Sequence, residues 1–392
     1  MTGFAERDAA RDVGMDADRI DALVDRLDRT YVASGKLPHL QLLLSRDERT
    51  VLSVSLGQAR ETGEMLRDDA LFRIASMTKP VTAVAFMMLV EQGLVRLDDP
   101  VTDVIPEFAR LRVGLEGCAL KRPMRMIDLL RHTSGLTYGL QRRTPIDARY
   151  RALGLDEFQQ KRTPDDFIAA VADIPLEFSP GESWNYSIST DVLGVVVERL
   201  TGMDLESLFH ARIFDPLGMP DSFFTVPADR VDRLTDAWRF TEDGLALSDR
   251  GARSSWSRPL RFRSGGGGLV SSTADYHRFA RMLLRGGELD GVRLLRAETV
   301  KAMRANHLPG GRDLASMSTG MFSEVDYAGV GFGLGLAMGL ETQDYSWGGI
   351  FSTWFFVDPL LRMIGILMTQ HLPSSTYPIR AELRAAARTA VK

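Results

Sequence analysis

The sequence is poorest in cysteine, and this scarcity excludes several kinds of site. Cys118 is the single cysteine among 392 residues, so the chain cannot form an intrachain disulfide. It also lacks the cysteine cluster of a structural zinc site. With one cysteine against 17 methionines, nothing in the composition points to an oxidising compartment.

An excess of charge of one sign is also missing. The 48 lysine and arginine residues face 52 aspartate and glutamate residues, which gives a net charge of −4 at pH 7. A nucleic-acid-binding surface requires clustered basic residues, so we expect no nucleic-acid partner. The hydrophobic fraction of 44% and the charged fraction of 26% are typical of soluble globular proteins. The length suits two domains or one large elaborated domain.

Long hydrophobic runs are absent as well. The longest, at residues 81–90, contains Thr82 and is followed directly by Glu91. It has about half the length that a membrane-spanning helix requires. Residues 1–8 are rich in charged side chains and lack the apolar stretch of a signal peptide. We therefore expect no membrane partner and a cytoplasmic protein.

The two ends of the chain carry similar patterns of strands and helices. Ile20, Leu23, Val24, Leu27 and Tyr31 have the spacing of an amphipathic helix. Two apolar runs separated by a charged turn then predict a β-hairpin. Further strands and a last helix are predicted near the C-terminus. The predicted strands lie at residues 40–44, 51–56, 332–338, 352–357 and 363–369, and the last helix begins at Pro378.

The middle of the chain predicts helices and long loops. Thr163, followed by proline, is typical of a helix start, and a second clear helix follows Asp191. We predict an α/β (α+β) fold, with an antiparallel sheet that helices cover on both faces. Residues 1–80 and 260–392 form a discontinuous sheet domain in this prediction, and residues 81–259 form a mostly helical inserted domain.

The pattern with the clearest chemical meaning is Ser76-Met77-Thr78-Lys79, directly before an apolar helical run. Ser76 is expected at a helix N-terminus, where the helix dipole favours developing negative charge. Residues three apart share a helix face, so the Lys79 amine can take the hydroxyl proton of Ser76 if burial or positive neighbours lower its pKa. The same pattern also fits a helix-capping serine followed by a solvated lysine.

Other short segments extend this pattern into a family resemblance. Together they resemble the serine β-lactamase and penicillin-binding-protein superfamily. The closest branch is the family VIII carboxylesterases, which are similar to class C β-lactamases. This resemblance implies a β-lactamase-like fold. The matching segments lie in family order at residues 72–80, 129–136, 180–187, 215–219, 266–272 and 347–349.

The resemblance implies roles for three side chains. Ser76 is the acylated nucleophile, and Lys79 and Tyr186 form its base system. A neighbouring ammonium would hold Tyr186 toward its phenolate form, which could then relay a proton to the leaving alkoxide. Without the motif order, Tyr186 fits a tyrosine packed at the start of the helix near Asp191.

The resemblance also implies a substrate-binding strand beside the nucleophile. Trp347, Gly348 and Gly349 stand where the third family motif belongs. Glycine lets the backbone approach a substrate closely. The backbone N–H groups of Ser76 and Ile350 would then form the oxyanion hole.

Departures from the family pattern indicate the substrate class. β-Lactamases usually have an asparagine two residues after the tyrosine, where this chain has Ile188. They usually have Lys-Thr-Gly as third motif, whereas Trp347-Gly348-Gly349 offers no charge for a carboxylate. We therefore predict a carboxylesterase that hydrolyses short-acyl, neutral esters through an acyl-Ser76 intermediate. A small-molecule ester is the expected partner.

Rival sites find little support in the sequence. A Gly-x-Ser-x-Gly motif is absent, no two histidines have i, i+4 spacing for a metal, and the glycine run at 265–268 lacks the Lys-Ser/Thr of a phosphate-binding loop. The glycines at 331, 333 and 335 are expected inside a strand, so we predict neither a cofactor nor a metal. His132 is expected to hold a loop by hydrogen bonding. The histidines are His39, His132, His210, His277, His307 and His371.

Several alternatives use the same three side chains. A cephalosporin-cleaving β-lactamase, a D-amino-acid peptidase and an acyltransferase all require a reactive serine with a lysine and a tyrosine. A non-enzymatic β-lactamase-like scaffold normally loses one of the three. The sequence leaves the natural substrate, the acyl and alcohol sizes and the oligomeric state open.

Overall fold

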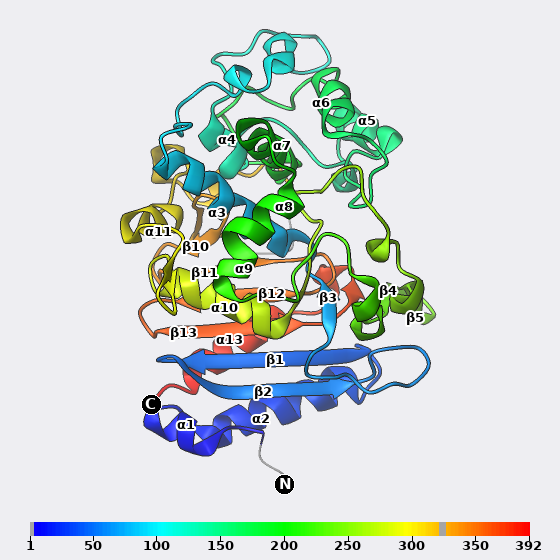
Figure 1. The fold of residues 1–392 in the computed structure, drawn as a ribbon, viewed down its shortest axis with the longest axis vertical. Helices are drawn as coiled ribbons and strands as arrows, with labels where there is room; N and C mark the ends of the chain where they lie inside the picture. Colours follow the sequence, from blue (N-terminus) through cyan, green and yellow to red (C-terminus); the bar gives the residue numbers. More distant parts are fainter. Residues whose placement is uncertain (1–3, 321–326) are drawn as a thin grey trace.

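A seven-stranded antiparallel sheet joins the two ends of the chain (Figure 1). The computed structural model describes residues 4–320 and 327–392. The strand order is β2-β1-β13-β12-β11-β10-β9, and every neighbouring pair is antiparallel. These strands are β1 (His39–Arg46), β2 (Arg49–Gly57), β9 (Val330–Phe332), β10 (Ala337–Gly339), β11 (Tyr345–Gly348), β12 (Trp354–Asp358) and β13 (Met363–Met368).

Strand β12 shows that both faces of this sheet are covered, as predicted. Trp354 and Phe356 pack into the core beneath the terminal helices. Phe355 and Val357 point the other way, into the main core. Because successive strand residues face opposite sides of a sheet, the four successive apolar residues 354–357 require a cover on each face.

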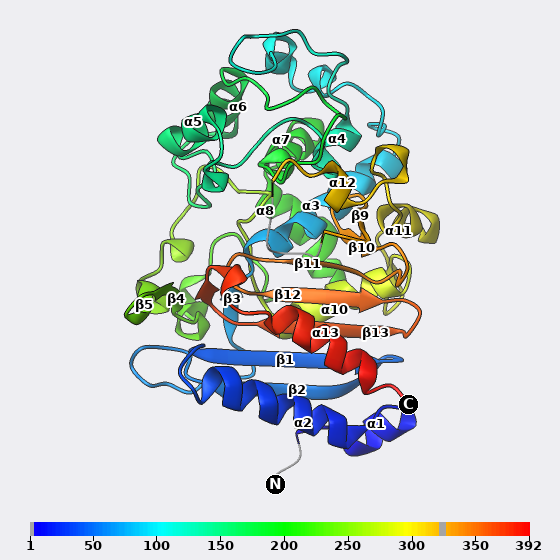
Figure 2. The same cartoon turned by 180° about the vertical axis from the view of Figure 1, so that it is seen from behind.

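Terminal helices supply one cover. Figure 2 shows α13 (Ile379–Thr389) across one face of the sheet, near α2 (Ala17–Leu27). The Asp16 side chain caps α2 by accepting hydrogen bonds from the backbone N–H groups of Asp18 and Arg19. Helix α10 (Thr273–Leu284) packs on the opposite face, against β12 and β13.

The rest of the fold is mainly helical, and α3 (Thr78–Glu91) lies inside it with most of its side chains buried. As predicted, Thr163 caps α6 (Pro164–Ala172) by accepting a hydrogen bond from the backbone N–H of Asp166. No helix among the described residues has the length and apolarity needed to cross a membrane. The remaining helices are α1 (Arg7–Asp12), α3 (Thr78–Glu91), α4 (Met126–Leu130), α5 (Pro145–Leu153), α6 (Pro164–Ala172), α7 (Ser189–Thr201), α8 (Leu205–Phe209), α9 (Asp215–Leu217), α11 (Ala297–Met303) and α12 (Leu314–Met317).

Short strands connect distant parts of the chain. β3 pairs with β6 beside the nucleophile segment, and β4 pairs with both β5 and β14. A hairpin from the predicted inserted segment therefore adjoins the C-terminal part, and the boundaries at residues 80 and 260 stay a prediction. These strands are β3 (Leu71–Arg73), β4 (Ala237–Thr241), β5 (Gly244–Asp249), β6 (Val270–Ser272), β7 (Glu288–Leu289), β8 (Val292–Arg293) and β14 (His371–Leu372).

The prediction of one strand over residues 332–338 is wrong. Strand β9 ends at Phe332 and β10 begins at Ala337, with a reversal between them. The Gly333 N–H donates to the Leu336 carbonyl at 2.8 Å, and Gly335 has φ +89°. Glycine adopts positive φ at little cost, so the alternating glycines mark a hairpin turn instead of a continuous strand.

Candidate active site

Ser76 lies in a tight turn at the start of a buried helix. The turn Ala75–Met77 connects β3 to α3. Ala75 has φ +44°, a left-handed conformation that is strained for a residue with a side chain. The Thr78 hydroxyl donates to the Ala75 carbonyl at 2.6 Å. Ser76 is 7% exposed. It lies two residues before the first residue of α3, at the helix N-terminus that the sequence predicted.

Lys79 is within hydrogen-bonding distance of the Ser76 hydroxyl. The Lys79 Nζ atom donates to Ser76 Oγ at 3.1 Å and to the Gly266 carbonyl at 2.5 Å. Lys79 is 1% exposed, which contradicts the alternative of a solvated lysine. Burial lowers the pKa of the Lys79 amine to about 7, and the negative charge of Asp191 opposes this shift. The amine therefore meets the condition for accepting a proton near neutral pH.

Tyr186 covers Lys79 with its ring. The Lys79 Nζ atom lies 4.6 Å from the Tyr186 ring centroid and 5.4 Å from that of Tyr138. Burial raises the pKa of the Tyr186 phenol, and hydrogen bonding with the Ser76 and Trp347 side chains opposes this rise. The expectation of a tyrosine held as phenolate is therefore wrong, because a low-dielectric site disfavours the charged form of both Lys79 and Tyr186.

The structure brings the third segment beside the turn that carries Ser76. Trp347 and Gly348 end β11, and the Trp347 ring lies 5.3 Å from the Tyr186 ring, centroid to centroid. A Cβ atom on Gly349 would lie 2.4 Å from the Ile74 carbonyl oxygen, so only glycine fits there. Ile350 follows directly, two residues along the chain from the end of the strand.

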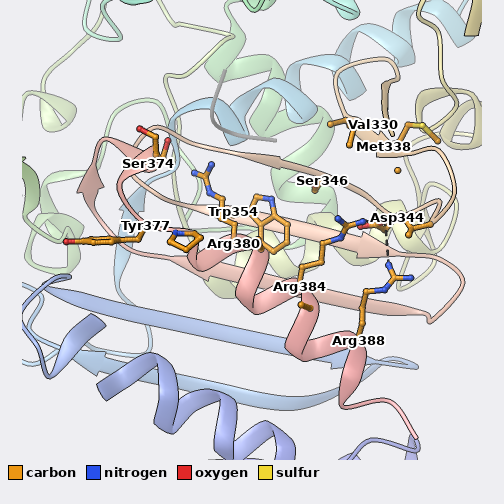
Figure 3. A pocket seen from close by; sticks show the side chains of 17 residues that line it. Val330, Met338, Asp344, Ser346, Trp354, Ser374, Tyr377, Arg380, Arg384 and Arg388 are labelled. Carbon is orange, nitrogen blue, oxygen red and sulfur yellow. Dashed lines mark hydrogen bonds and ion pairs between the residues drawn. The ribbon is translucent and has the colours of Figure 1, made fainter. Parts of the chain in front are cut away.

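A salient contact that the sequence did not reveal comes from the last helix. The Arg380 Nη2 atom donates to the carbonyls of Gly349 at 2.6 Å and Thr353 at 2.9 Å. Arg380 also lines a cavity of about 610 Å³ between α13 and the sheet, together with Arg384 and Arg388 (Figure 3). Arginines four residues apart on one helix face were a visible signal, but their partners were not.

His132 supports the loop next to Tyr186. The rings of His132 and Tyr186 lie 4.9 Å apart, and the His132 Nδ1 atom is 3.2 Å from the Ser187 hydroxyl. Burial lowers the pKa of His132 well below its usual value. A neutral histidine hydrogen-bonded in this way agrees with the predicted loop-holding role.

Residues 4–320 and 327–392 contain no group of three or more His, Cys, Asp or Glu side chains placed to hold a metal ion. The polar groups beside the Ser76 hydroxyl are instead the Lys79 amine and the Tyr186 phenol. This pair of groups is suited to proton transfer.

Comparison with known proteins decides the family. The family model described as Beta-lactamase matches residues 24–389. The chain belongs to the beta-lactamase family. This beta-lactamase-family chain is 37% identical to Protein Rv1367c of Mycobacterium tuberculosis (strain ATCC 25618 / H37Rv). The alignment spans 335 residues and covers 80% of each of the two chains. It is 32% identical over 386 residues to esterase EstB of Burkholderia gladioli, which covers 90% of each chain.

Solved structures share the fold of this beta-lactamase-family protein. EstCE1, described as a hydrolase with promiscuous acyltransferase activity, has a TM-score of 0.80 at 24% identity, over 95% of this chain and 98% of its own. The predicted membership of the β-lactamase superfamily and the β-lactamase-like fold are confirmed. The family and its esterase relative support a hydrolase.

Proposed function

We propose that this protein is a serine carboxylesterase that hydrolyses short-acyl, neutral esters through an acyl-Ser76 intermediate. The observation that carries the proposal is the buried pair formed by Lys79 Nζ and Ser76 Oγ, 3.1 Å apart. A serine hydroxyl needs an adjacent base before it becomes a good nucleophile. The pKa of Lys79, lowered to about 7, lets its amine act as that base at neutral pH.

Acylation begins with proton transfer from Ser76 to Lys79. The Ser76 oxygen attacks the ester carbonyl carbon, and the N–H groups of Ser76 and Ile350 stabilise the oxyanion. The protonated Tyr186 phenol gives its proton to the leaving alkoxide and regains one from the Lys79 ammonium. Breaking the carbon–oxygen bond releases the alcohol and leaves Ser76 acylated, with Lys79 neutral again.

Hydrolysis of the acyl-enzyme completes the cycle. A water molecule gives a proton to Lys79 and attacks the acyl carbonyl carbon. Collapse of this second intermediate releases the carboxylic acid, and the Ser76 oxygen takes the proton back from Lys79. The same base therefore serves both halves of the reaction.

Uncharged surroundings favour a neutral substrate. Trp347, Gly348 and Gly349 carry no charge, and Ile188 replaces the amide typical of β-lactamases. The side chains of Tyr138, Tyr186 and Trp347 are 4% exposed or less. A substrate carboxylate would gain no ion pair from this segment to offset its loss of hydration. The name of the relative EstB, an esterase, supports ester hydrolysis.

Acyl transfer is the second candidate. The description of EstCE1 names promiscuous acyltransferase activity, and an alcohol could attack acyl-Ser76 in place of water. Adding butanol to an ester assay separates the two, because transfer produces a butyl ester while hydrolysis produces only the acid.

The predicted cytoplasmic location stays a prediction.

A substrate panel tests the proposed function. We expect rapid hydrolysis of p-nitrophenyl acetate and butyrate, with slow or no cleavage of nitrocefin and of a D-alanyl p-nitroanilide. Ser76→Ala should abolish ester hydrolysis while the far-ultraviolet circular dichroism stays unchanged. Preferential cleavage of nitrocefin or of the D-alanyl amide would instead favour a β-lactamase or a peptidase. A folded protein inactive on the whole panel would favour a scaffold.

A further inference from the structure

We propose that Asp191 is a positioning residue: its carboxylate holds Gly266, whose carbonyl accepts a hydrogen bond from Lys79, and its negative charge acts on the Lys79 amine. This inference rests on the proposed role of Lys79 as the base. Neither the family motifs nor the sequence pattern assigned Asp191 a part in the reaction. It lies in the first turn of α7, five residues after Tyr186.

A short chain of contacts links Asp191 to Lys79. The Asp191 Oδ1 atom accepts hydrogen bonds from the Ser264 hydroxyl at 2.5 Å and from the Gly266 N–H at 3.1 Å. The carbonyl of the same Gly266 accepts the 2.5 Å hydrogen bond from Lys79 Nζ. The carboxylate thus holds Gly266, the residue whose carbonyl accepts the second hydrogen bond of the Lys79 amine.

Gly266 fits against Asp191 without room for a side chain. A Cβ atom at this position would lie 2.3 Å from the Asp191 Oδ2 atom. The neighbouring Gly265 carbonyl is fixed by the Thr82 hydroxyl at 2.7 Å. Residues 265–266 are therefore held by contacts from both α3 and α7, which leaves the Gly266 carbonyl little freedom to move.

Three of the side chains around the Lys79 amine carry no charge near pH 7, whereas Asp191 is negatively charged. Tyr138 and Tyr186 are buried tyrosines whose pKa values are raised, and His132 is a buried histidine whose pKa is lowered. All three are therefore neutral near pH 7. Asp191 is 5% exposed, and its negative charge raises the pKa of Lys79 against the effect of burial.

More distant charges act on the neighbours of Lys79. Asp156 acts on Asp191 and Tyr138, and Arg380 acts on Tyr186. Burial raises the pKa of Asp191, while the Lys79 charge and the hydrogen bond from Ser264 lower it. Lys79 and Asp191 each favour the charged form of the other, so their titrations are coupled.

A purely structural role of Asp191 would leave the pH dependence of the reaction unchanged, whereas its negative charge would shift it. Asp191→Asn removes the negative charge and leaves an amide oxygen that can still accept the Gly266 N–H. Lys79 should then lose its proton more readily, so the acidic limb of the reaction should move to lower pH. An opposite charge at close range typically shifts a pKa by about one unit or more.

The test measures the rate of Ser76 labelling by a fluorophosphonate between pH 5 and 9, together with kcat/KM for p-nitrophenyl acetate. Asp191→Asn is expected to shift the acidic limb of both profiles down by roughly one pH unit. Asp147→Asn is the matched control, because Asp147 is also buried and also accepts hydrogen bonds from backbone N–H groups. Its profile should follow that of the wild type.

Each outcome separates this inference from the proposed function. If the limb stays fixed in folded Asp191→Asn while Ser76 is still labelled, the inference fails and the esterase proposal stands. If wild-type Ser76 is not labelled, the esterase proposal itself fails. Should Asp191→Asn not fold, Ser264→Ala replaces it. This variant removes a hydrogen bond that favours the Asp191 carboxylate, so a smaller shift in the same direction is expected and an unchanged limb would overturn the inference.

Discussion

The Lys79 Nζ atom lies 3.1 Å from the Ser76 Oγ atom, and each side chain is less than a tenth exposed. This pair brings a nucleophile at a helix N-terminus next to an amine whose pKa is lowered by burial. The chemistry proposed for the protein depends on this relationship.

Activity is predicted to rise with pH across the neutral range. Lys79 accepts the Ser76 proton only when neutral, and its pKa is about 7. Below pH 7 the amine is increasingly protonated, so kcat/KM for p-nitrophenyl acetate should fall about tenfold per pH unit well below that value. A profile that is flat between pH 5 and 8 would contradict Lys79 as the base.

Removing the amine is predicted to disable the enzyme without unfolding it. Lys79→Met keeps an apolar chain of similar length in a buried site, so the fold should remain stable. Loss of a general base typically lowers the rate by about 10²–10⁴-fold. Lys301→Met, at an exposed position on α11, is the control and should keep wild-type kcat/KM. Comparable losses in both variants would point to a general effect of lysine replacement.

The Arg380 contacts predict an effect on kcat. Arg380 fixes the carbonyls at both ends of the 349–353 loop, which includes Ile350. Arg380→Met should loosen this loop and lower kcat by up to about 10²-fold, near the effect of losing one oxyanion donor. Arg384→Met is the comparison, since Arg384 lines the same cavity but pairs with Asp344. Equal kcat values for the two variants would argue against a role for the loop contacts.

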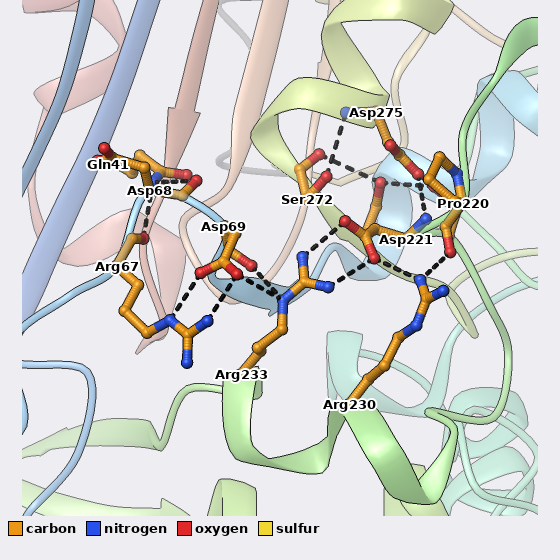
Figure 4. A network of polar contacts seen from close by, with 12 residues as sticks. Gln41, Arg67, Asp68, Asp69, Pro220, Asp221, Arg230, Arg233, Ser272 and Asp275 are labelled. Atoms are coloured by element: carbon orange, nitrogen blue, oxygen red, sulfur yellow. Dashed lines mark hydrogen bonds and ion pairs between the residues drawn. The ribbon is translucent and has the colours of Figure 1, made fainter.

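Asp275 predicts a pH dependence of stability. Its carboxylate accepts hydrogen bonds from the Asp221 N–H and the Ser222 hydroxyl (Figure 4), yet burial raises its pKa to about 6. The folded state therefore binds this proton more tightly than the unfolded state, whose pKa is about 4. This group favours folding below pH 4, and the advantage is lost as the pH rises through 6.

Urea unfolding at pH 4 and pH 8 measures this effect. Relative to the wild type, Asp275→Asn should gain up to about 3 kcal/mol in unfolding free energy on going from pH 4 to pH 8. Asp243→Asn, at an exposed turn between β4 and β5, should show no such relative change. A constant difference between wild type and Asp275→Asn at both pH values would show that Asp275 does not carry the linkage.

Residue spacing and the order of the family segments predicted which side chains gather at the site. The spacing of Ser76 and Lys79 sets their proximity on one helix, and the order of family segments indicated Tyr186. The sequence could not reveal contacts between distant segments. The Gly266 N–H meets Asp191 across 75 positions, and Arg380 meets Gly349 across 31. Such pairs depend on how the sheet and helices pack, which residue spacing does not encode.

Two errors have physical causes of the same kind. The alternating glycines near Gly333 fit either a strand or a turn, and the backbone hydrogen bond to Leu336 decides in favour of the turn. The charge state of Tyr186 depended on burial, which a sequence pattern does not measure. An exposed tyrosine beside an ammonium would be held toward phenolate, whereas a buried one beside an amine of lowered pKa keeps its proton.

Mass spectrometry of the fluorophosphonate-treated protein tests the central claim most directly. Peptide mapping is predicted to show one covalent adduct, on Ser76, whose formation parallels the loss of esterase activity. Ser76→Ala should remain unlabelled. Folded, ester-cleaving protein with an unmodified Ser76 would contradict the mechanism.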